Sequence, residues 1–411
     1  MKHVTTVIIG AGQCGLAMSR ALSSRAIDHV VLERNVVGNS WHHERWDSLR
    51  LLTPNWMNVF FGRSCGDPDG YMHSRDFARI LDLVAADINA PVETNTEVRR
   101  VSRHGDGYRV ETDRDIWSCD SVVLASGGAA RPSLPDFHTA VPGDTNVLTA
   151  ATYRRPQQIA EGRVLVVGAS ASGLQIASEL NEAGRDVVLA VGQHLRLPRR
   201  YRGADILTWM HVAGILDTHY TEVDDIDRLR RAPSLALQGD PSFRDLDLNT
   251  LQNQGVEIVG RLAAINDGNA WFSGGLPNLC TSSDLKLKRL LERIDTWISD
   301  NRPGPGAPAA DTFVPTRFPD APRLSIGLSA GRVGTIIWAT GFIPDHRFVN
   351  LPVFDHKGHI RHNGGKVAPG LYVLGLPYLR RARSSHISGA VGDAQALATH
   401  LADRLPRRLY A

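Results

Sequence analysis

The stretch VIIGAGQCG, residues 7–15, decides the fold, because it joins a β-branched apolar run to a G-x-G-x-x-G turn. This order predicts a buried parallel strand, a tight turn and the start of a helix. The unpaired N–H groups of that helix start and the positive end of the helix dipole both attract phosphate. We therefore predict that a dinucleotide pyrophosphate binds here, against Gly10, Gly12, Gln13 and Gly15.

A carboxylate stands at the distance that this motif requires. The second strand is expected over residues 29–32 and ends at Glu33, 23 positions after the first glycine of the turn. Dinucleotide folds place at this point the acid that accepts hydrogen bonds from the adenosine ribose. Glu33 and the adjacent Arg34 are thus predicted cofactor-binding residues, and strand 4–9 with helix 13–25 completes the first βαβ unit.

A second glycine turn, VLVVGASASG at residues 164–173, follows another apolar run. It predicts a second βαβ unit that starts at Arg163 and has its next strand over residues 187–191. Two such cradles in one chain imply two dinucleotides held face to face. The chemistry that normally needs both is hydride transfer from a nicotinamide to a flavin. The predicted contacts of the second dinucleotide are Gly168, Ser170, Ala171, Ser172 and Gly173.

No acid follows the second strand of this unit. The sequence instead continues as GQHLR, residues 192–196, and then reaches Arg199 and Arg200. A missing acid removes the partner of a free ribose 2′-hydroxyl, while nearby cations suit a 2′-phosphate. The pattern therefore favours NADPH over NADH, with Arg196, Arg199 or Arg200 as the phosphate contact and Arg196 as the residue that we predict.

Two further runs end in small residues, which let a backbone approach a cofactor closely. Residues 121–124 are followed by ASGG, and residues 333–341 (VGTIIWATG) repeat the pattern. A last strand over 371–374 and a helix over 388–400 close the chain. The turn residues that we predict to lie near the cofactors are Ser126, Gly127, Thr340 and Gly341.

These elements predict an α/β protein with two Rossmann-like domains. An NADPH-binding domain, residues 151–330, is inserted into a discontinuous FAD-binding domain, residues 1–150 and 331–411. Apolar residues at helical spacing over 284–299 indicate a helix that packs one face on the second domain. The run PGPGAP, residues 303–308, is expected to be a linker or exposed loop.

The composition is that of an ordinary globular protein, with 42% hydrophobic residues and a formal net charge of +3 over 411 residues. This charge is too small to indicate nucleic-acid binding, and no apolar run approaches the roughly 18 residues that span a membrane. The four cysteines form no C-x-x-C pair, and no metal site is predicted. Since the first strand begins near Met1, we expect a cytoplasmic protein. No pattern indicates an oligomeric state.

Together the motifs resemble those of the class B flavin-dependent monooxygenases, a superfamily of FAD- and NADPH-binding proteins. The resemblance covers nearly the whole chain. Beyond the first glycine turn and Glu33, it rests on Gly38-x-x-Trp41, on RWDSLRLLTP at residues 45–54, on YRRP at 153–156, on ATG at 339–341 and on GLP at 375–377.

The resemblance implies that NADPH reduces FAD, that O₂ adds at flavin C4a, and that the resulting (hydro)peroxide oxidises a small organic substrate. It also implies further contacts for the flavin. Trp41 and Thr53 would line the isoalloxazine, and Val98 would meet the adenine from its strand. Gly375 and Leu376 would lie near the flavin ring.

The chain departs from the family pattern at four positions. Thr149 replaces the histidine of the fingerprint before the second cradle, and Leu52 replaces an asparagine that can reach the flavin–oxygen region. Ser170 replaces the middle glycine of the second turn, and Gly192-Gln193 stands where an arginine is common. These changes keep two alternatives open: an NADPH-dependent reductase, dehydrogenase or oxidase without oxygen insertion, and a non-enzymatic flavin or nucleotide sensor.

Overall fold

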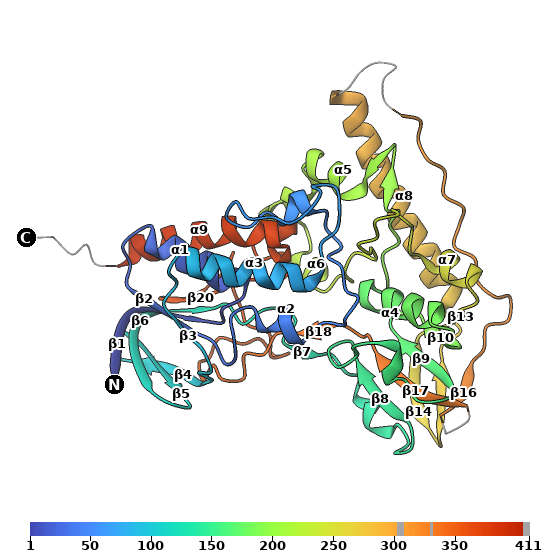
Figure 1. Ribbon diagram of the computed structural model, residues 1–411, viewed down its shortest axis with the longest axis horizontal. Helices are drawn as coiled ribbons and strands as arrows, with labels where there is room; N and C mark the ends of the chain where they lie inside the picture. The colour runs from blue at the N-terminus through green and yellow to red at the C-terminus, as the bar shows by residue number, and fades with distance from the viewer. Residues whose placement is uncertain (302–307, 329–331, 406–411) are drawn as a thin grey trace, which may run out of the picture.

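The computed structural model describes residues 1–301, 308–328 and 332–405. Two lobes lie side by side along its long axis (Figure 1). The blue and red ends of the chain share one lobe and the green and yellow middle forms the other, so the second lobe is inserted into the first. The predicted insertion is confirmed. Of the predicted linker, only Pro308 lies within the described residues.

A largely parallel sheet forms the centre of the first lobe, in the order β19-β20-β6-β1-β2-β3. Its middle strand β1 (Lys2–Ile9) pairs in parallel with β2 and β6. The antiparallel strands β4 and β5 extend from β6. The other bounds are β2 (His29–Leu32), β3 (Val92–Glu93), β4 (Val98–His104), β5 (Gly107–Thr112), β6 (Ile116–Leu124), β19 (Lys366–Ala368) and β20 (Leu371–Val373).

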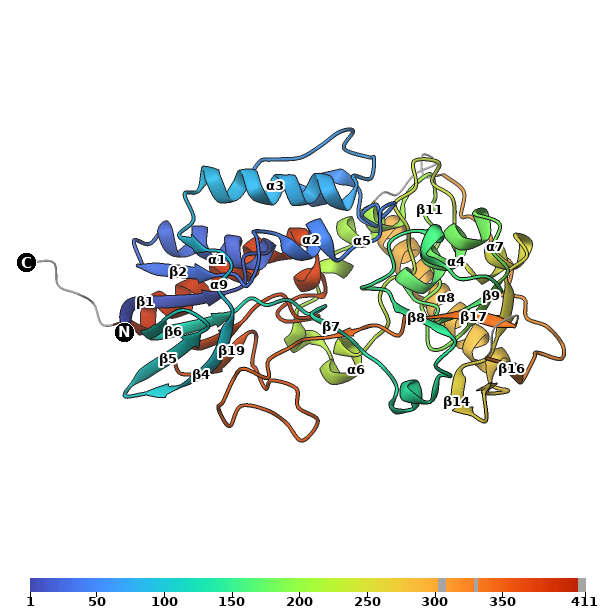
Figure 2. The same cartoon turned by 60° about the horizontal axis from the view of Figure 1, so that its bottom comes forward.

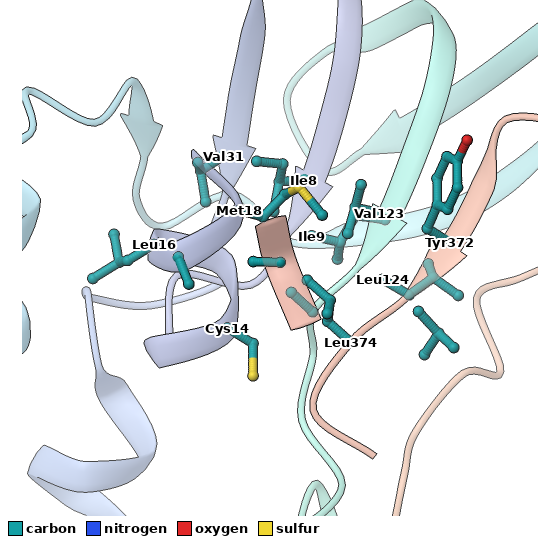
Figure 3. Close-up of a cluster of buried hydrophobic side chains, with 14 of the residues drawn as sticks. Ile8, Ile9, Cys14, Leu16, Met18, Val31, Val123, Leu124, Tyr372 and Leu374 are labelled. Atoms are coloured by element: carbon teal, nitrogen blue, oxygen red, sulfur yellow. The ribbon is translucent and has the colours of Figure 1, made fainter. Parts of the chain in front are cut away.

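Three helices pack together beside this sheet: α1 (Gln13–Ser23), α3 (Ser74–Asp87) and α9 (Ile387–Arg404). Figure 2 shows α3 above α1 and α9. Ile8 from β1 and Leu16 from α1 are fully buried, and Figure 3 shows them in one core with Leu374. A strand covered on both faces needs a continuous apolar run, which explains the VII of residues 7–9.

The second lobe has its own parallel sheet, in the order β13-β10-β9-β17-β8. Alternate residues of β9 enter different cores, because successive side chains point to opposite faces of a sheet. Val164 packs with the helices α4, α7 and α8, and Leu165 packs with the small sheet β14-β15-β16. The bounds are β8 (Asn146–Thr149), β9 (Arg163–Val167), β10 (Val187–Ala190), β13 (Glu257–Val259), β14 (Leu262–Asn266), β15 (Asn269–Phe272), β16 (Ser325–Gly327), β17 (Val333–Trp338), α4 (Ala171–Glu182), α7 (Leu248–Asn253) and α8 (Leu276–Asn301).

The sheets correct the predicted domain boundaries. β8 and β17 were expected in the FAD-binding domain, because they precede residue 151 or follow residue 330, but both belong to the second sheet. The chain instead crosses between the lobes at β7 (Arg131–Pro132) and β18 (Phe342–Ile343), which pair with each other. The apolar pattern of β17 correctly predicted a strand. The lobe to which the strand belongs follows from its pairing with β8 and β9, which the pattern does not give.

A second connection joins the lobes, and we call it the interlobe strap: residues 217–222 of the inserted lobe against residues 380–383 of the first lobe. Backbone hydrogen bonds and ion pairs hold it together. The contacts are Tyr220 N to Arg380 O (2.9 Å), Ala382 N to Thr218 O (3.1 Å), and the ion pairs of Asp217 with Arg381 (3.2 Å) and Arg383.

The remaining elements are short. They are α2 (Asn39–His43), α5 (Ile206–Val212), α6 (Ile226–Arg230), β11 (Arg200–Tyr201), β12 (Ala204–Asp205), and the 3₁₀ turns 55–58, 136–140, 156–158, 215–217, 220–222 and 382–385.

Candidate cofactor-binding site

A cavity of about 2060 Å³ lies between the lobes, and both glycine turns line it. The carboxyl ends of β1, β2 and β6 open onto it from one side, and those of β9, β10 and β17 from the other. This is the edge of parallel sheets at which α/β proteins bind their ligands. The predicted residues that line it are Gly10, Gly12, Gln13, Glu33, Arg34, Trp41, Val98, Ser126, Gly127, Gly168, Ser170, Ser172, Thr340, Gly341, Gly375 and Leu376.

The three glycines of the first turn have different physical roles. Gly10 has φ +106°, and a Cβ there would lie 2.6 Å from the carbonyl oxygen of Ala125. A Cβ on Gly15 would lie 1.8 Å from the carbonyl oxygen of Gly10, so this glycine lets the helix pack on the turn. Gly12 precedes α1, and a Cβ there would meet nothing within 4 Å. The backbone at Gly12 therefore faces open space at a helix start, which fits a pyrophosphate.

Glu33 ends β2 as predicted and has a fixed carboxylate. Its Oε2 accepts a hydrogen bond from Ala11 N at 2.9 Å, and its Oε1 accepts one from Asn35 N at 3.0 Å. A carboxylate has further lone pairs, so Glu33 can still accept from ribose hydroxyls. Arg34 reaches the cavity wall and forms an exposed ion pair with Glu44 at 3.3 Å.

The second turn repeats the geometry of the first. Gly168 has φ +110°, and a Cβ there would lie 2.4 Å from the carbonyl oxygen of Ala339. Ser170 precedes α4 with φ −87° and ψ −173°, close to the −81° and −171° of Gly12. Any residue can adopt this extended backbone, so the serine is tolerated and brings a hydroxyl to the cavity. Ala171 and Gly173 are buried behind this surface, where a Cβ on Gly173 would lie 1.8 Å from Gly168 O.

An aromatic wall lies beside the first turn. The indole Nε1 of Trp41 donates a hydrogen bond to Gln13 Oε1 at 3.1 Å, and the Trp41 ring packs edge-on against Phe77. The guanidinium of Arg45 lies 5.2 Å from the Trp41 ring centre. Gly375 has φ +78°, and a Cβ there would lie 2.9 Å from Cys14 Sγ. These contacts hold Trp41 and Gly375 at the cavity.

Two small-residue turns meet the cavity where the lobes join. The Oγ of Ser126 is buried without a hydrogen-bond partner in the described part of the chain. Thr340 Oγ1 donates to Ser133 O at 2.5 Å, so its hydroxyl can only accept further hydrogen bonds. Buried polar atoms normally have partners, and an orphan on a cavity wall fits a bound polar group. The residues thus fit two dinucleotides.

Two predicted contacts lie elsewhere. Thr53 is buried and donates its hydroxyl to Asn58 Oδ1 at 2.6 Å, away from the cavity wall. Arg196, the predicted phosphate contact, is also buried and outside the cavity lining. Its guanidinium binds Asp247 at 2.8 Å and Asp284 at 2.9 Å. Arg196 is therefore a structural ion-pair residue in this fold, which corrects the prediction.

Arg199 is also buried and paired, so its guanidinium does not face the cavity. It is 1% exposed, forms an ion pair with Asp205 at 2.6 Å and donates a hydrogen bond to Leu52 O at 2.8 Å. The acids that capture Arg196 and Arg199 are distant in sequence or belong to another turn. A run of cations after a strand therefore could not reveal which guanidinium stays available.

Several cavity residues were not predicted. Arg261 follows β13, where a strand pattern ending in Gly260 could have indicated it. Burial lowers the pKa of Arg45, and the nearby Arg154 lowers it further. Burial also lowers the pKa of His346 and of His362 to about 4, so both are neutral near pH 7. Arg45 begins the motif RWDSLRLLTP, from which we predicted only Thr53 as a contact, and no local motif marks His346 or His362.

The described residues contain no cluster of three or more His, Cys, Asp or Glu side chains arranged to hold a metal. Within the same ranges, no helix is long and apolar enough to cross a membrane.

Comparisons with known proteins support this geometry. Residues 7–207 match a family described as pyridine nucleotide-disulphide oxidoreductase. The structure superposes with a TM-score of 0.67 on a flavin-containing monooxygenase from Stenotrophomonas maltophilia, at 18% identity over 98% of this chain and 99% of that one. It also superposes on OTEMO, solved in complex with FAD and NADP, with a TM-score of 0.56, at 15% identity over 97% of this chain and 85% of the other.

The protein thus has the fold of the two-dinucleotide flavoproteins, as predicted. An uncharacterized CzcO-like oxidoreductase from Geobacillus kaustophilus is 30% identical over 403 residues, which cover 97% of this chain and 98% of that protein. The chain belongs to the CzcO-like oxidoreductase family. The predicted cofactors, FAD and NADPH, agree with the family match and with the pair bound in OTEMO.

Proposed function

We propose that the protein is an FAD-dependent monooxygenase that takes electrons from NADPH and inserts one oxygen atom from O₂ into a small organic substrate. FAD binds the first lobe and NADPH binds the inserted lobe. The observation that supports this most strongly is the shared cavity, because both glycine turns line it and their helix starts face one space. When bound, NADPH supplies a hydride and reduced FAD activates O₂.

The chain's own contribution is to bind, orient and exclude water. In this proposal Gly12 and Glu33 hold the pyrophosphate and ribose of FAD, and the Gln13–Trp41 hydrogen bond fixes the wall beside the flavin ring. Leu376 and Pro377 add apolar surface to the same cavity. A dry wall strengthens electrostatic interactions and limits loss of reactive species to water.

Arg45 gives this wall a positive charge. Its guanidinium donates to Glu44 O at 3.2 Å and forms no ion pair shorter than 4 Å with a carboxylate in the described ranges. A desolvated cation lacking such a partner attracts anionic groups. We expect Arg45 to stabilise negative charge on a substrate or cofactor at the junction of the lobes.

A reductase or oxidase without oxygen insertion is the second candidate, because Leu52 offers no polar side chain to the cavity. Leu52 instead packs with the apolar cluster around Met57 and Ile206. Thr149 lies at the end of β8, where its backbone N–H donates a hydrogen bond to Thr152 Oγ1 at 2.9 Å. Of the departures from the family pattern, Leu52 thus supplies no hydrogen-bonding side chain, and Thr149 uses its hydroxyl within its own turn.

Stopped-flow spectroscopy of the purified holoprotein distinguishes the candidates. We expect NADPH to bleach the flavin under anaerobic conditions. On mixing with O₂, a transient absorbance distinct from reduced and oxidised flavin, followed by substrate-dependent product, supports the monooxygenase. Direct return to oxidised flavin with one hydrogen peroxide per NADPH, for every substrate tested, supports the second candidate. A flavin that NADPH does not bleach contradicts both.

A further inference from the structure

The sheet of the inserted lobe brings one arginine beside the loop that lacks an acid. β10 pairs in parallel with β13, and Ala190 is the partner of Val259. Gly192 and Arg261 each lie two positions beyond these partners. Because parallel strands end at a common edge, both residues reach the edge that carries the second glycine turn.

The side chains confirm this placement. A Cβ on Gly192 would lie 3.7 Å from Arg261 Nε and 3.9 Å from Nη2, so the guanidinium packs directly against the loop after β10. Gly260 permits this position, because a Cβ there would lie 1.9 Å from Ser273 O on the segment after β15. Gly192, Gln193 and Arg261 all line the cavity.

The charge of Arg261 is available to a ligand. In the described ranges its guanidinium has neither an ion pair nor a hydrogen bond, whereas Arg196 and Arg199 are tied to carboxylates. In the first lobe the residue after the second strand, β2, is Glu33, which binds its own turn. The second lobe has no acid after the corresponding strand, β10, and instead has Arg261 after the neighbouring strand, β13.

We propose that Arg261 is the residue that selects a ribose bearing a 2′-phosphate, and that it does so from the strand next to the usual position. The inference rests on the proposed binding of NADPH to the inserted lobe and adds the specificity-determining residue. A guanidinium forms charge-assisted hydrogen bonds with a phosphate monoester, but a free 2′-hydroxyl gains little from it.

Isothermal titration of the FAD-loaded protein with NADP⁺ and with NAD⁺ tests the proposal without relying on activity. We expect Arg261→Gln to weaken NADP⁺ binding by about 10- to 100-fold, which is the usual effect of losing a charged hydrogen bond, and to change NAD⁺ binding by less than about twofold. Arg261→Lys keeps the charge and should retain part of the preference.

Arg289→Gln is the matched control, because Arg289 is an exposed arginine of α8 outside the cavity lining. Flavin content of each variant reports whether the fold is intact. An unchanged ratio of NADP⁺ to NAD⁺ affinity in Arg261→Gln would overturn the inference, and so would an equal loss for both nucleotides or a loss of the same size in Arg289→Gln. If the wild-type protein binds neither nucleotide, the proposed function fails at its cofactor and the inference fails with it.

Discussion

Gly10 and Gly12 stand two positions apart and need to be glycine for different reasons. Gly10 combines φ +106° with contact to the backbone of Ala125, while Gly12 has an ordinary extended backbone and open space beside it. The first glycine serves the fold, and the second serves the ligand.

We expect Gly10→Ala to lower the free energy of unfolding by about 1–3 kcal/mol, because it adds backbone strain and a close contact. Gly12→Val should leave the melting temperature of the apoprotein nearly unchanged and reduce FAD retention strongly. Thermal melts and the flavin-to-protein absorbance ratio measure both effects. A Gly12→Val protein that keeps full flavin content would show that no pyrophosphate approaches this turn.

Glu33→Gln tests the ribose contact. The amide nitrogen cannot accept the hydrogen bond that one carboxylate oxygen now accepts from Ala11 or Asn35, and the negative charge is lost. We expect the dissociation constant of FAD to rise about tenfold. Glu111→Gln, in the meander of β5, serves as the control, because Glu111 does not line the cavity. Equal FAD affinity in the two variants would argue against the assigned role of Glu33.

At the scale of elements, α8 shows how far helical spacing can be trusted. The spacing predicted a helix over 284–299 with one buried face, and the helix runs from Leu276 to Asn301. Ile294 and Ile298 are buried against α5, whereas Leu285 is 46% exposed. The spacing of apolar residues thus predicted the helix, but it did not predict that Leu285 is exposed to solvent.

We predict that Ile294→Ala lowers the free energy of unfolding by about 2–4 kcal/mol, because it opens a cavity in this interface. Leu285→Ala should change it by less than about 0.5 kcal/mol. Urea denaturation of both variants gives the comparison. Similar losses at the two positions would mean that α8 does not bury the face described.

The segment 344–362 along the cavity gives the protein a pH-dependent stability. An unfolded histidine has a pKa near 6.5, and burial lowers the pKa of His346 and His362 to about 4. Between these values the unfolded chain binds more protons than the folded chain, so the free energy of unfolding rises with pH and is fully present above about pH 6.5.

We expect His346→Gln to flatten the dependence of stability on pH between about 4 and 6.5. Denaturation at several pH values measures the slope, and the exposed His104→Gln provides the comparison. A slope as steep in His346→Gln as in the wild type would mean that this imidazole does not stay neutral in the folded protein.

At the scale of the whole molecule, every strand of the second sheet comes from one continuous stretch, from β8 to β17. We predict that a fragment of residues 133–341 folds on its own and binds NADP⁺ without FAD. A fragment of residues 151–330, the boundaries suggested by sequence, lacks β8 and β17 and should not fold, because β17 lies inside the sheet next to β9. Circular dichroism and NADP⁺ titration of both fragments decide between the boundaries.

Local chemistry explains which features the sequence could predict. The turn at Gly10 with the carboxylate of Glu33, and the second turn at Gly168, each follow the residue spacing of a single βαβ unit, so spacing alone identified them. The fates of Arg196 and Arg261 depend on contacts between distant segments. Arg196 meets Asp247 and Asp284, while Arg261 meets the loop after β10 through a strand pairing. Spacing along the chain carries no information on such partners.

The lobes meet at the β7–β18 pairing, at the interlobe strap, and where Leu52 and Tyr71 of the first lobe bond to Arg199 and Asp205 of the inserted lobe. If β7 and β18 stay paired, one lobe can rotate relative to the other only about the point where these two strands cross between the lobes. A movement of this kind that separated residues 217–222 from residues 380–383 would break the ion pair between Asp217 and Arg381. Because salt weakens exposed ion pairs, higher ionic strength should weaken this contact between the lobes.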